Sequence, residues 1–419
     1  MVFAAAMRGG MIWALHDNLN EDIDAYHVIA ENLRQHGVYS RQPTQEESDV
    51  SNQLRPTAYR PPLYPMLLSR IGAGPRLSNT TVAILHILLG VGTVALVYLL
   101  AHLWQIEKWG IVAGIFVACD PILLHWSTFT MTETLATFLA VTSLVSLTYF
   151  SRDKTPWSAG LTGGLLALAT LCRPTFFVWL IFAAAFAVFM KVRWTRRCLN
   201  PAAMLIMAAL ILLPWTLRNY GLFGRPIFAT THGGYTLLLG NNPYFYAYLR
   251  QGNWGMAWEA DQFHEGWKRE RKNVGEFADD QQAYALALDS IREEPGMFLF
   301  ASVVRVGRLW SPMPHQLSKN ESSKHRLLRY MTASWYAVIF VLAIAGTFVL
   351  RGQLLQTPWV WGVLLLLSIT AVHTFYWSNM RMRAPLMPLV CLLAAVGVEC
   401  FARQRAERNL LRESELEQS

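Results

Sequence analysis

Three acidic residues near the ends of apolar segments, Asp22, Asp24 and Glu133, are the strongest candidates for chemistry. Two carboxylates at one membrane surface can supply a base for an acceptor hydroxyl and a second group that orients the acceptor or holds a metal. Asp22 and Asp24 also precede a helical pattern, so both can simply cap a helix, and the sequence leaves the two interpretations open. Glu133 begins an apolar segment, where a charge is costly unless it faces a polar cavity.

Arginines at the ends of apolar segments form a second group of candidate site residues, opposite in charge to the three carboxylates. They are Arg60, Arg173, Arg218, Arg381 and Arg383. A guanidinium group binds phosphate through two parallel hydrogen bonds, so these residues suit a phosphate headgroup. For any single arginine, extension towards lipid phosphates is the better interpretation. Their convergence on one membrane face favours a binding site.

A series of apolar segments must position these side chains. The chain has 419 residues, of which 53% are hydrophobic and 15% charged, a balance typical of membrane proteins. Segments near the length that a bilayer requires lie at about 81–104, 109–127, 133–150, 157–172, 174–190, 200–217, 332–350, 358–377 and 384–401. The apolar start, residues 1–15, carries Arg8 and is expected to be a truncated or mis-started first span.

The distribution of basic residues predicts the orientation of these spans. One set of alternate connections holds most of the lysines and arginines and is therefore expected to be cytoplasmic, together with a basic tail at 402–419. The opposite face receives two long polar segments, at about 15–80 and 218–330. The sequence predicts amphipathic helices in both, one that ends at Gly37 in the first segment and one that breaks at Pro295 in the second. The expected domains are therefore a transmembrane core with its first loop (1–217), an outer loop region of mixed structure (218–330), C-terminal transmembrane helices (331–401) and the tail.

Several classes of function lack their usual motifs. The sequence contains no GxSxG, HExxH, P-loop or GxGxxG pattern, so hydrolase, zinc protease and nucleotide-binding functions are not supported. The net charge of +8 resides in short loops and sets topology, so no nucleic-acid partner is expected. His27 near Asp22 and Asp24 leaves a divalent metal ion open, although a lone histidine is more often a surface group.

The order of several motifs resembles a known family. They are DIDAYHVIAENLRQHGVYS, PTAYRPPLYPMLL, MTETLATFL, PWTLRNYGLFGRP with GGYTLLLGNNP, and MRMRAPLMPL. Together they are similar to bacterial members of the dolichyl-phosphate-mannose protein mannosyltransferase-like family of the GT-C superfamily, which is related to the lipid A aminoarabinose transferases. The likeness runs from about residue 15 to residue 400.

This resemblance implies an all-α membrane bundle of about 9–11 spans and inverting transfer of a sugar from a polyprenyl phosphate. It implies Asp22 as the base, with Asp24 in reserve, Glu133 as the second-loop acid, and Arg381 or Arg383 on the donor phosphate. The expected contacts to sugar or acceptor are Tyr26, Tyr64, Asn241 and Asn242, although the two asparagines can equally close a turn.

The implied partners are the lipid-linked donor, a lipid, glycan or protein acceptor, and membrane lipids. The implied location is a bacterial inner membrane, with the site facing the periplasm. A transporter or flippase for a lipid-linked saccharide would also use arginines at one face, and a non-catalytic scaffold would not need the carboxylates at all. Transport favours ionisable or helix-breaking residues near the midplane and two related halves, and the sequence shows no such halves.

Overall fold

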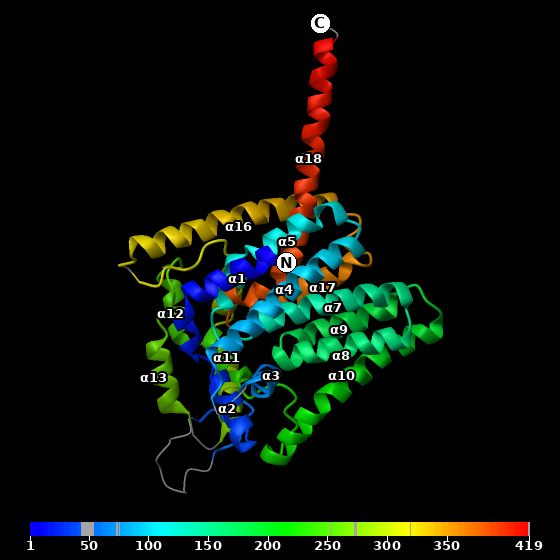
Figure 1. Cartoon of the computed structure of the whole chain (residues 1–419). Helices are drawn as coiled ribbons and strands as arrows, with labels where there is room; N and C mark the ends of the chain where they lie inside the picture. Colours follow the sequence, from blue (N-terminus) through cyan, green and yellow to red (C-terminus); the bar gives the residue numbers. More distant parts are fainter. Residues whose placement is uncertain are drawn as a thin grey trace.

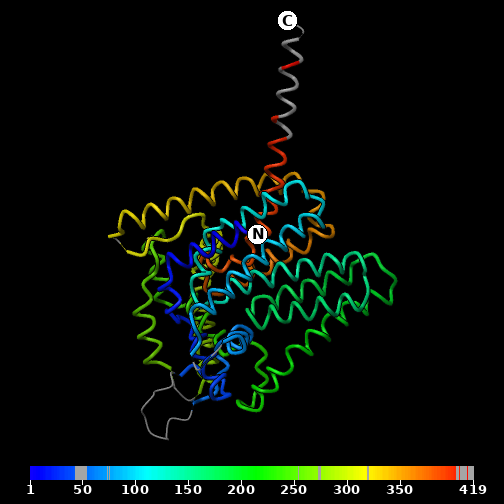
Figure 2. Tube along the Cα trace, viewed as in Figure 1, coloured from blue at the N-terminus to red at the C-terminus, as the bar shows by residue number. Residues whose placement is uncertain are grey.

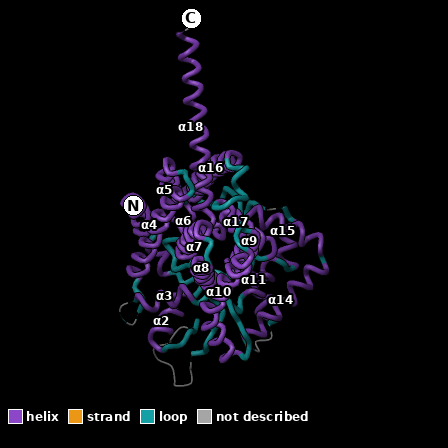
Figure 3. The backbone as a smooth tube through the Cα atoms, turned by 90° about the vertical axis from the view of Figure 1, so that its right-hand side faces the viewer, coloured by secondary structure: helices purple, strands orange, loops and turns teal. Residues whose placement is uncertain are grey.

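The computed structural model describes residues 1–42, 54–72, 74, 76–252, 254–271, 275–318 and 320–417. Over these residues the chain is helical, and its β-structure is confined to one isolated bridge between Met256 and Gln316 (Figure 3). The helices are α1 (Val2–Ala14), η1 (His16–Asn20), α2 (Tyr26–His36), α3 (Leu63–Ile71), α4 (Asn79–Leu103), η2 (Glu107–Trp109), α5 (Gly110–Ala118), α6 (Pro121–Trp126), α7 (Glu133–Asp153), α8 (Pro156–Cys172), α9 (Phe176–Phe189), α10 (Trp194–Phe223), α11 (Gly233–Gly240), α12 (Pro243–Arg250), α13 (Asp261–Glu270), α14 (Glu276–Glu293), α15 (Pro295–Leu309), α16 (Ser323–Val349), α17 (Trp359–Phe375), η3 (Met380–Leu386) and α18 (Met387–Glu417). The predicted all-α membrane fold is confirmed.

Five helical stretches of the described chain are long and apolar enough to cross a membrane. They are α4, α7, α10, α16 and the stretch Met380–Ala402, while α1, α8, α9 and α17 are shorter apolar helices. The range 109–127, predicted as one span, is two short helices instead, α5 and α6. The break has a local cause, because the Asp120 side chain accepts the Leu123 N–H at 3.0 Å and Pro121 begins the next helix.

Helices α7, α8, α9 and α10 pack side by side, and Figure 3 shows the first three almost end-on. Glycines permit the closest approaches. A Cβ atom on Gly163 of α8 would lie 2.0 Å from the Met204 carbonyl oxygen of α10. Small residues at such contacts are usual where membrane helices pack backbone to backbone. Helix α16 crosses the N-terminal part of α18 in the same way at Gly346 and Gly397 (Figures 1 and 2).

The two polar segments form helices beside this bundle. In the first, α2 ends at Gly37, whose φ of 67° is the left-handed conformation that glycine adopts readily. In the second, helices α11 to α15 account for most of the chain, and the predicted break at Pro295 separates α14 from α15. The region expected to be of mixed structure is therefore helical, apart from loops and the isolated bridge.

Candidate functional site

A cavity of about 520 Å³ opens where the two polar segments meet the bundle. Its walls come from the start of α2, the segment around Arg60, the turn between α8 and α9, the loop 226–232 with the start of α11, α14, and the chain from the end of α17 to η3. Of the predicted site residues, five line this cavity: Asp24, Tyr26, Arg60, Arg173 and Arg381. The other seven do not line it.

Glu133 lies beside the cavity and holds two of its arginines. The carboxylate is 1% exposed, and its Oε1 lies 2.5 Å from Arg173 Nη2 and 3.1 Å from Arg381 Nε. The first contact is a hydrogen bond, whereas Arg381 Nε–H does not point at the oxygen and the second contact is an ion pair only. Thr132 Oγ1 also accepts from Arg173 Nε at 3.0 Å. Two cations against one buried anion leave a net positive charge at this wall.

Asp24 and Arg60 form a second ion pair in the cavity wall. Arg60 Nη2 lies 2.6 Å from Asp24 Oδ1, and Arg60 Nε donates to the Asp24 carbonyl at 3.1 Å. Burial lowers the pKa of Arg60, but the Asp24 carboxylate raises it, and the net direction is upward. Arg60 is therefore permanently charged. Tyr39 steadies the same segment, because its hydroxyl donates to the carbonyls of Arg60 and Pro61 at 3.0 and 3.1 Å.

Asp22 makes the contacts of a helix cap. Its Oδ1 accepts the His27 N–H at 3.0 Å, and its Oδ2 accepts the Val28 N–H at 2.9 Å, so both oxygens satisfy free donors in the first turn of α2. Of the two interpretations that the sequence left open for Asp22 and Asp24, capping matches the contacts of Asp22 alone. The structure brings Asp24 to the cavity and leaves Asp22 outside its lining.

Of the four predicted contacts to sugar or acceptor, Tyr26 lines the cavity and the other three do not. Burial raises the pKa of the Tyr26 hydroxyl, which therefore stays protonated. Tyr64 packs edge-on against Tyr26 behind the wall, with its hydroxyl 2.8 Å from His86 Nε2. Asn241 and Asn242 are buried elsewhere. Asn242 Oδ1 caps α12 through the Phe245 N–H, and Asn241 Nδ2 donates to the Leu237 and Phe375 carbonyls.

Two of the five predicted phosphate-binding arginines lie outside the cavity lining and hold backbone carbonyl groups. Arg218 Nη1 donates to the Thr57 carbonyl at 2.7 Å and to Asn219 Oδ1 at 2.8 Å. Arg383 Nη1 donates to the carbonyls of Leu309 and Ser311 at 2.9 and 2.5 Å, and its guanidinium stacks on Tyr336. Both arginines therefore make contacts that fasten chain segments together.

One part of the cavity lining, which we call the aromatic wall, was not predicted from the sequence and carries one further carboxylate. Its members are Tyr59, His232, Asp280, Tyr284, Tyr376 and Trp377. Burial raises the pKa of Asp280 to about 6, and its Oδ1 accepts the Gly234 N–H at 2.7 Å. The signal was the glycine pair in GGYTLLLG, since a Cβ atom on Gly234 would lie 2.1 Å from the Asp280 carbonyl oxygen. These glycines allow α11 to pack onto α14 and do not form a turn.

The sequence left a divalent metal ion open near His27, Asp22 and Asp24. Among the described residues, no group of three or more histidines, cysteines, aspartates or glutamates is arranged to hold a metal ion. His27 Nδ1 lies 3.5 Å from Glu31, within the same helix.

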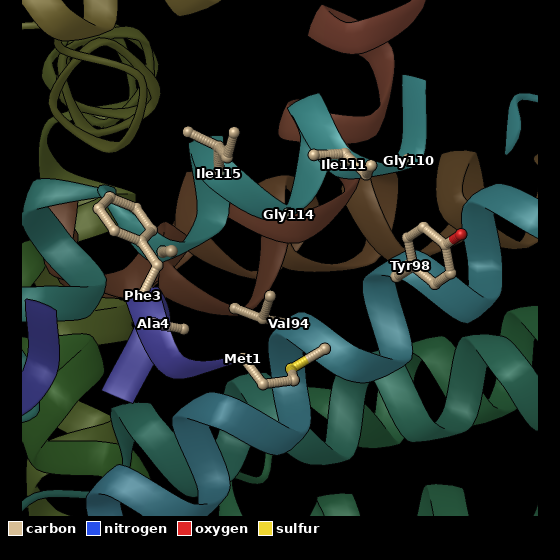
Figure 4. A pocket seen from close by; sticks show the side chains of 10 residues that line it. Met1, Phe3, Ala4, Val94, Tyr98, Gly110, Ile111, Gly114 and Ile115 are labelled. Carbon is tan, nitrogen blue, oxygen red and sulfur yellow. The ribbon is translucent and has the colours of Figure 1, made fainter. Parts of the chain in front are cut away.

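A second cavity, of about 390 Å³, lies between α1, α4 and α5 (Figure 4). Its lining includes Phe3, Val94, Tyr98 and Ile115, and the side chains that line it are apolar apart from the tyrosine hydroxyl. No charged side chain lines this cavity, so the larger cavity, with its arginines and carboxylates, is the candidate site.

Comparison with known proteins supports the interpretation drawn from the motifs. Residues 60–217 match the family model described as dolichyl-phosphate-mannose-protein mannosyltransferase. No curated protein matches the chain in sequence.

Among solved structures, the apo oligosaccharyltransferase of Archaeoglobus fulgidus is similar with a TM-score of 0.51 and 17% identity, over 98% of this chain and 51% of that one. The chain thus spans about half the length of that protein. ArnT from Cupriavidus metallidurans, apo and bound to undecaprenyl phosphate, aligns with a TM-score of 0.39 in both cases, at 15% and 14% identity, over 94% and 96% of this chain and 76% and 77% of that one.

The family match covers the segment that supplies Arg60, Glu133 and Arg173, and the fold match covers nearly the whole chain. The resemblance inferred from the sequence is therefore confirmed: this is a membrane protein with the GT-C fold that resembles the dolichyl-phosphate-mannose-protein mannosyltransferases.

Proposed function

We propose that the protein is a membrane glycosyltransferase that moves a sugar from a polyprenyl-phosphate donor to an acceptor hydroxyl. The observation that carries this proposal is that two arginines, Arg173 and Arg381, share one cavity with the ion pair of Asp24 and Arg60. Guanidinium groups suit a phosphate, and a carboxylate suits the proton of an attacking hydroxyl. The family match of residues 60–217 supports the same reaction class.

The chemistry is a direct displacement. The acceptor oxygen forms a bond to C1 of the sugar, the bond from C1 to the phosphate oxygen breaks, and the phosphate leaves with the electron pair. The acceptor proton passes to the carboxylate of Asp24, and attack from the face opposite the phosphate inverts the anomeric centre. Arg173 and Arg381 stabilise the charge that develops on the leaving phosphate, so no strong acid is needed.

Asp24 is favoured over Asp22 as the base because both oxygens of Asp22 already accept backbone N–H groups. Asp24 uses Oδ1 for Arg60, and the side chain lines the cavity. The aromatic wall of the same cavity, with Tyr284 and Trp377, offers flat apolar surface of the kind on which a sugar ring packs.

The placement of basic residues supports a site on the non-cytoplasmic face of a bacterial inner membrane, with the C-terminal tail in the cytoplasm. On this arrangement the two polar segments, 15–80 and 218–330, lie on the periplasmic side and the lipid tail of the donor stays in the bilayer. The acceptor, whether lipid, glycan or protein, approaches from the outer side.

A transfer assay tests the proposal. Purified protein receives radiolabelled polyprenyl-phosphate sugars and candidate acceptors, and Asp24→Asn is compared with Asp22→Asn. Loss of a general base lowers kcat by about 10²–10⁴-fold, so Asp24→Asn should lose transfer. Asp22→Asn keeps one acceptor oxygen for α2 and should retain most of it.

Three results would contradict this assignment. Equal activity in the two variants would exclude Asp24 as the base. Activity lost only in Asp22→Asn would return the role to Asp22. Movement of labelled lipid across a vesicle membrane, with no transfer from any donor, would favour a transporter.

A further inference from the structure

Glu276, the first residue of α14, holds two separate segments of the cavity wall. Its Oε1 accepts the Ala58 N–H at 2.8 Å, and its Oε2 accepts the Thr57 hydroxyl at 2.5 Å. The Thr231 hydroxyl also donates to Oε1. Beside these bonds, the Thr231 N–H donates to the Ala58 carbonyl at 3.0 Å. One carboxylate therefore accepts three hydrogen bonds from two segments that lie more than 170 residues apart in sequence.

The residues that follow these contacts face the cavity. Tyr59 and Arg60 come directly after Ala58, and His232 follows Thr231. The rings of Tyr59 and His232 lie 4.2 Å apart between centroids, so the two segments that Glu276 holds also meet in the cavity lining. Arg60 then reaches Asp24 through two contacts, at 2.6 Å to the carboxylate and 3.1 Å to the carbonyl.

We propose that Glu276 is a positioning residue that sets the orientation of Asp24, acting through the segment 57–60 and the guanidinium group of Arg60. The inference rests on the proposed function, since it assigns Asp24 a reaction to perform. Bonds from neutral donors to an ionised carboxylate are stronger than those between neutral groups, so Glu276 restrains this segment more than a packing contact would. Arg218 adds to the restraint through the Thr57 carbonyl.

The donor phosphate is held by a different part of the protein. Arg173 and Arg381 are fixed by Glu133, on α7, and neither makes a hydrogen bond to the segment 57–60. A change at Glu276 should therefore disturb the base and leave donor binding intact. A positioning role therefore predicts a lower kcat with an unchanged KM for the donor, a pattern that loss of overall stability does not produce.

The test compares full-length purified protein with Glu276→Gln, which keeps the size of the side chain and removes its charge. We expect kcat to fall about tenfold, the equivalent of one charge-assisted hydrogen bond. The KM for a labelled polyprenyl-phosphate sugar should stay within about twofold of the wild-type value. Glu265→Gln is the matched control, because Glu265 is an exposed glutamate on α13 of the same polar segment and should behave as wild type.

Two further measurements identify the path of the effect. Thr57→Val removes one of the donors, and the double variant Thr57→Val with Glu276→Gln should lose less than the product of the two single effects, since both act through one bond. Hydrogen exchange of the peptide that contains residues 54–60 should be faster in Glu276→Gln than in Glu265→Gln, because the Ala58 N–H loses its charged acceptor.

The possible results separate the two proposals. If the wild type transfers sugar and Glu276→Gln keeps its kcat, or raises KM without lowering kcat, the positioning role is wrong while the proposed function stands. Unchanged exchange at residues 54–60 also overturns the positioning role, whether or not transfer is observed. Failure of the wild type to use any donor rejects the proposed function itself, and the positioning role with it.

Discussion

The carboxylate of Glu133 is enclosed by two guanidinium groups, and its Oε2 has no hydrogen-bond partner. A buried ion of this kind is stabilised only by its partners, since moving it from water into the protein is costly. Arg173 and Arg381 in turn need Glu133, because without it two like charges would face each other at one wall. We infer that Glu133 holds the arginines in place and that the arginines face the cavity.

Removing this charge is expected to destabilise the protein. Glu133→Gln leaves two cations, which are 13% and 18% exposed, without their anion, and the cost is at most about the 3–5 kcal/mol that breaking a fully buried pair takes. The midpoint of thermal unfolding of the purified protein should fall clearly. The control is Asp289→Asn, which breaks an exposed ion pair with Arg292 worth at most about 1 kcal/mol. Equal midpoints for the two variants would show that Glu133 is not needed to balance the arginines.

Asp280 gives a prediction about pH. Burial raises the pKa of its carboxyl from 3.8 to about 6, so the folded protein holds a proton that the unfolded chain releases between about pH 4 and pH 6. The contribution of Asp280 to stability is therefore fully present below pH 3.8 and is lost as the pH rises through about 6. The variant Asp280→Asn has no titrating carboxyl at this position, so its stability lacks this dependence on pH.

The difference in unfolding midpoint between wild type and Asp280→Asn measures this effect. The wild type should lose stability relative to the variant as the pH rises from 4 to 7. A difference that stays constant over this range would mean that the carboxyl is not protonated in the folded state.

At the scale of elements, the bundle depends on close contacts between helix backbones. Helices α8 and α10 meet where Gly163 faces the Met204 carbonyl, and α16 meets α18 through Gly346 and Gly397. Arg173 follows the last residue of α8, so the separation of α8 from α10 also fixes one of the cavity arginines. Packing in the bundle and geometry in the cavity are thus connected through the end of one helix.

A substitution at this contact tests the connection. Gly163→Val places atoms where the Met204 carbonyl lies, so α8 and α10 must separate, and overpacking of this kind costs about 1–3 kcal/mol. We expect a lower unfolding midpoint and a lower yield of folded protein. Gly221→Ala is the control, because a Cβ atom on Gly221 of α10 meets no atom within 4 Å. Similar losses in both variants would contradict the proposed role of the contact.

At the scale of the whole molecule, the cavity forms where two polar segments close over one end of the bundle. Its walls combine residues from the first segment, from α14 and from the chain near η3. Polar groups and apolar helices therefore meet at one level, as a donor with a charged headgroup and a hydrocarbon tail requires.

Labelling of single cysteines tests the proposed orientation. In a variant without the five native cysteines, Glu265→Cys lies in the second polar segment and Gln353→Cys lies in the connection between α16 and α17, and both positions are exposed. A membrane-impermeant maleimide added to intact cells should label position 265, whereas position 353 should react only after permeabilisation. Labelling of both from the same side would reject the orientation.

Local signals in the sequence predicted the elements well. Runs of apolar residues, Gly37 and Pro295 marked helices and their ends, because hydrophobicity and backbone restriction act within a few residues. The range 109–127 was predicted as one span because its apolar composition hid the cap at Asp120. The aromatic wall was not predicted at all, since Tyr284 and Trp377 look like ordinary core residues in sequence.

The amino-acid sequence by itself determined that the chain is a helical membrane protein and which family it resembles, because apolar runs and motif order are properties of the chain. Only the tertiary structure decided which charges meet. Asp24 and Arg60 are 36 residues apart and Glu133 and Arg173 are 40 apart, so their contacts depend on how helices pack. The same holds for Asp22 and Asp24, two residues apart, where the left-handed turn at Ala25 leads one carboxylate to the backbone of α2 and the other to Arg60.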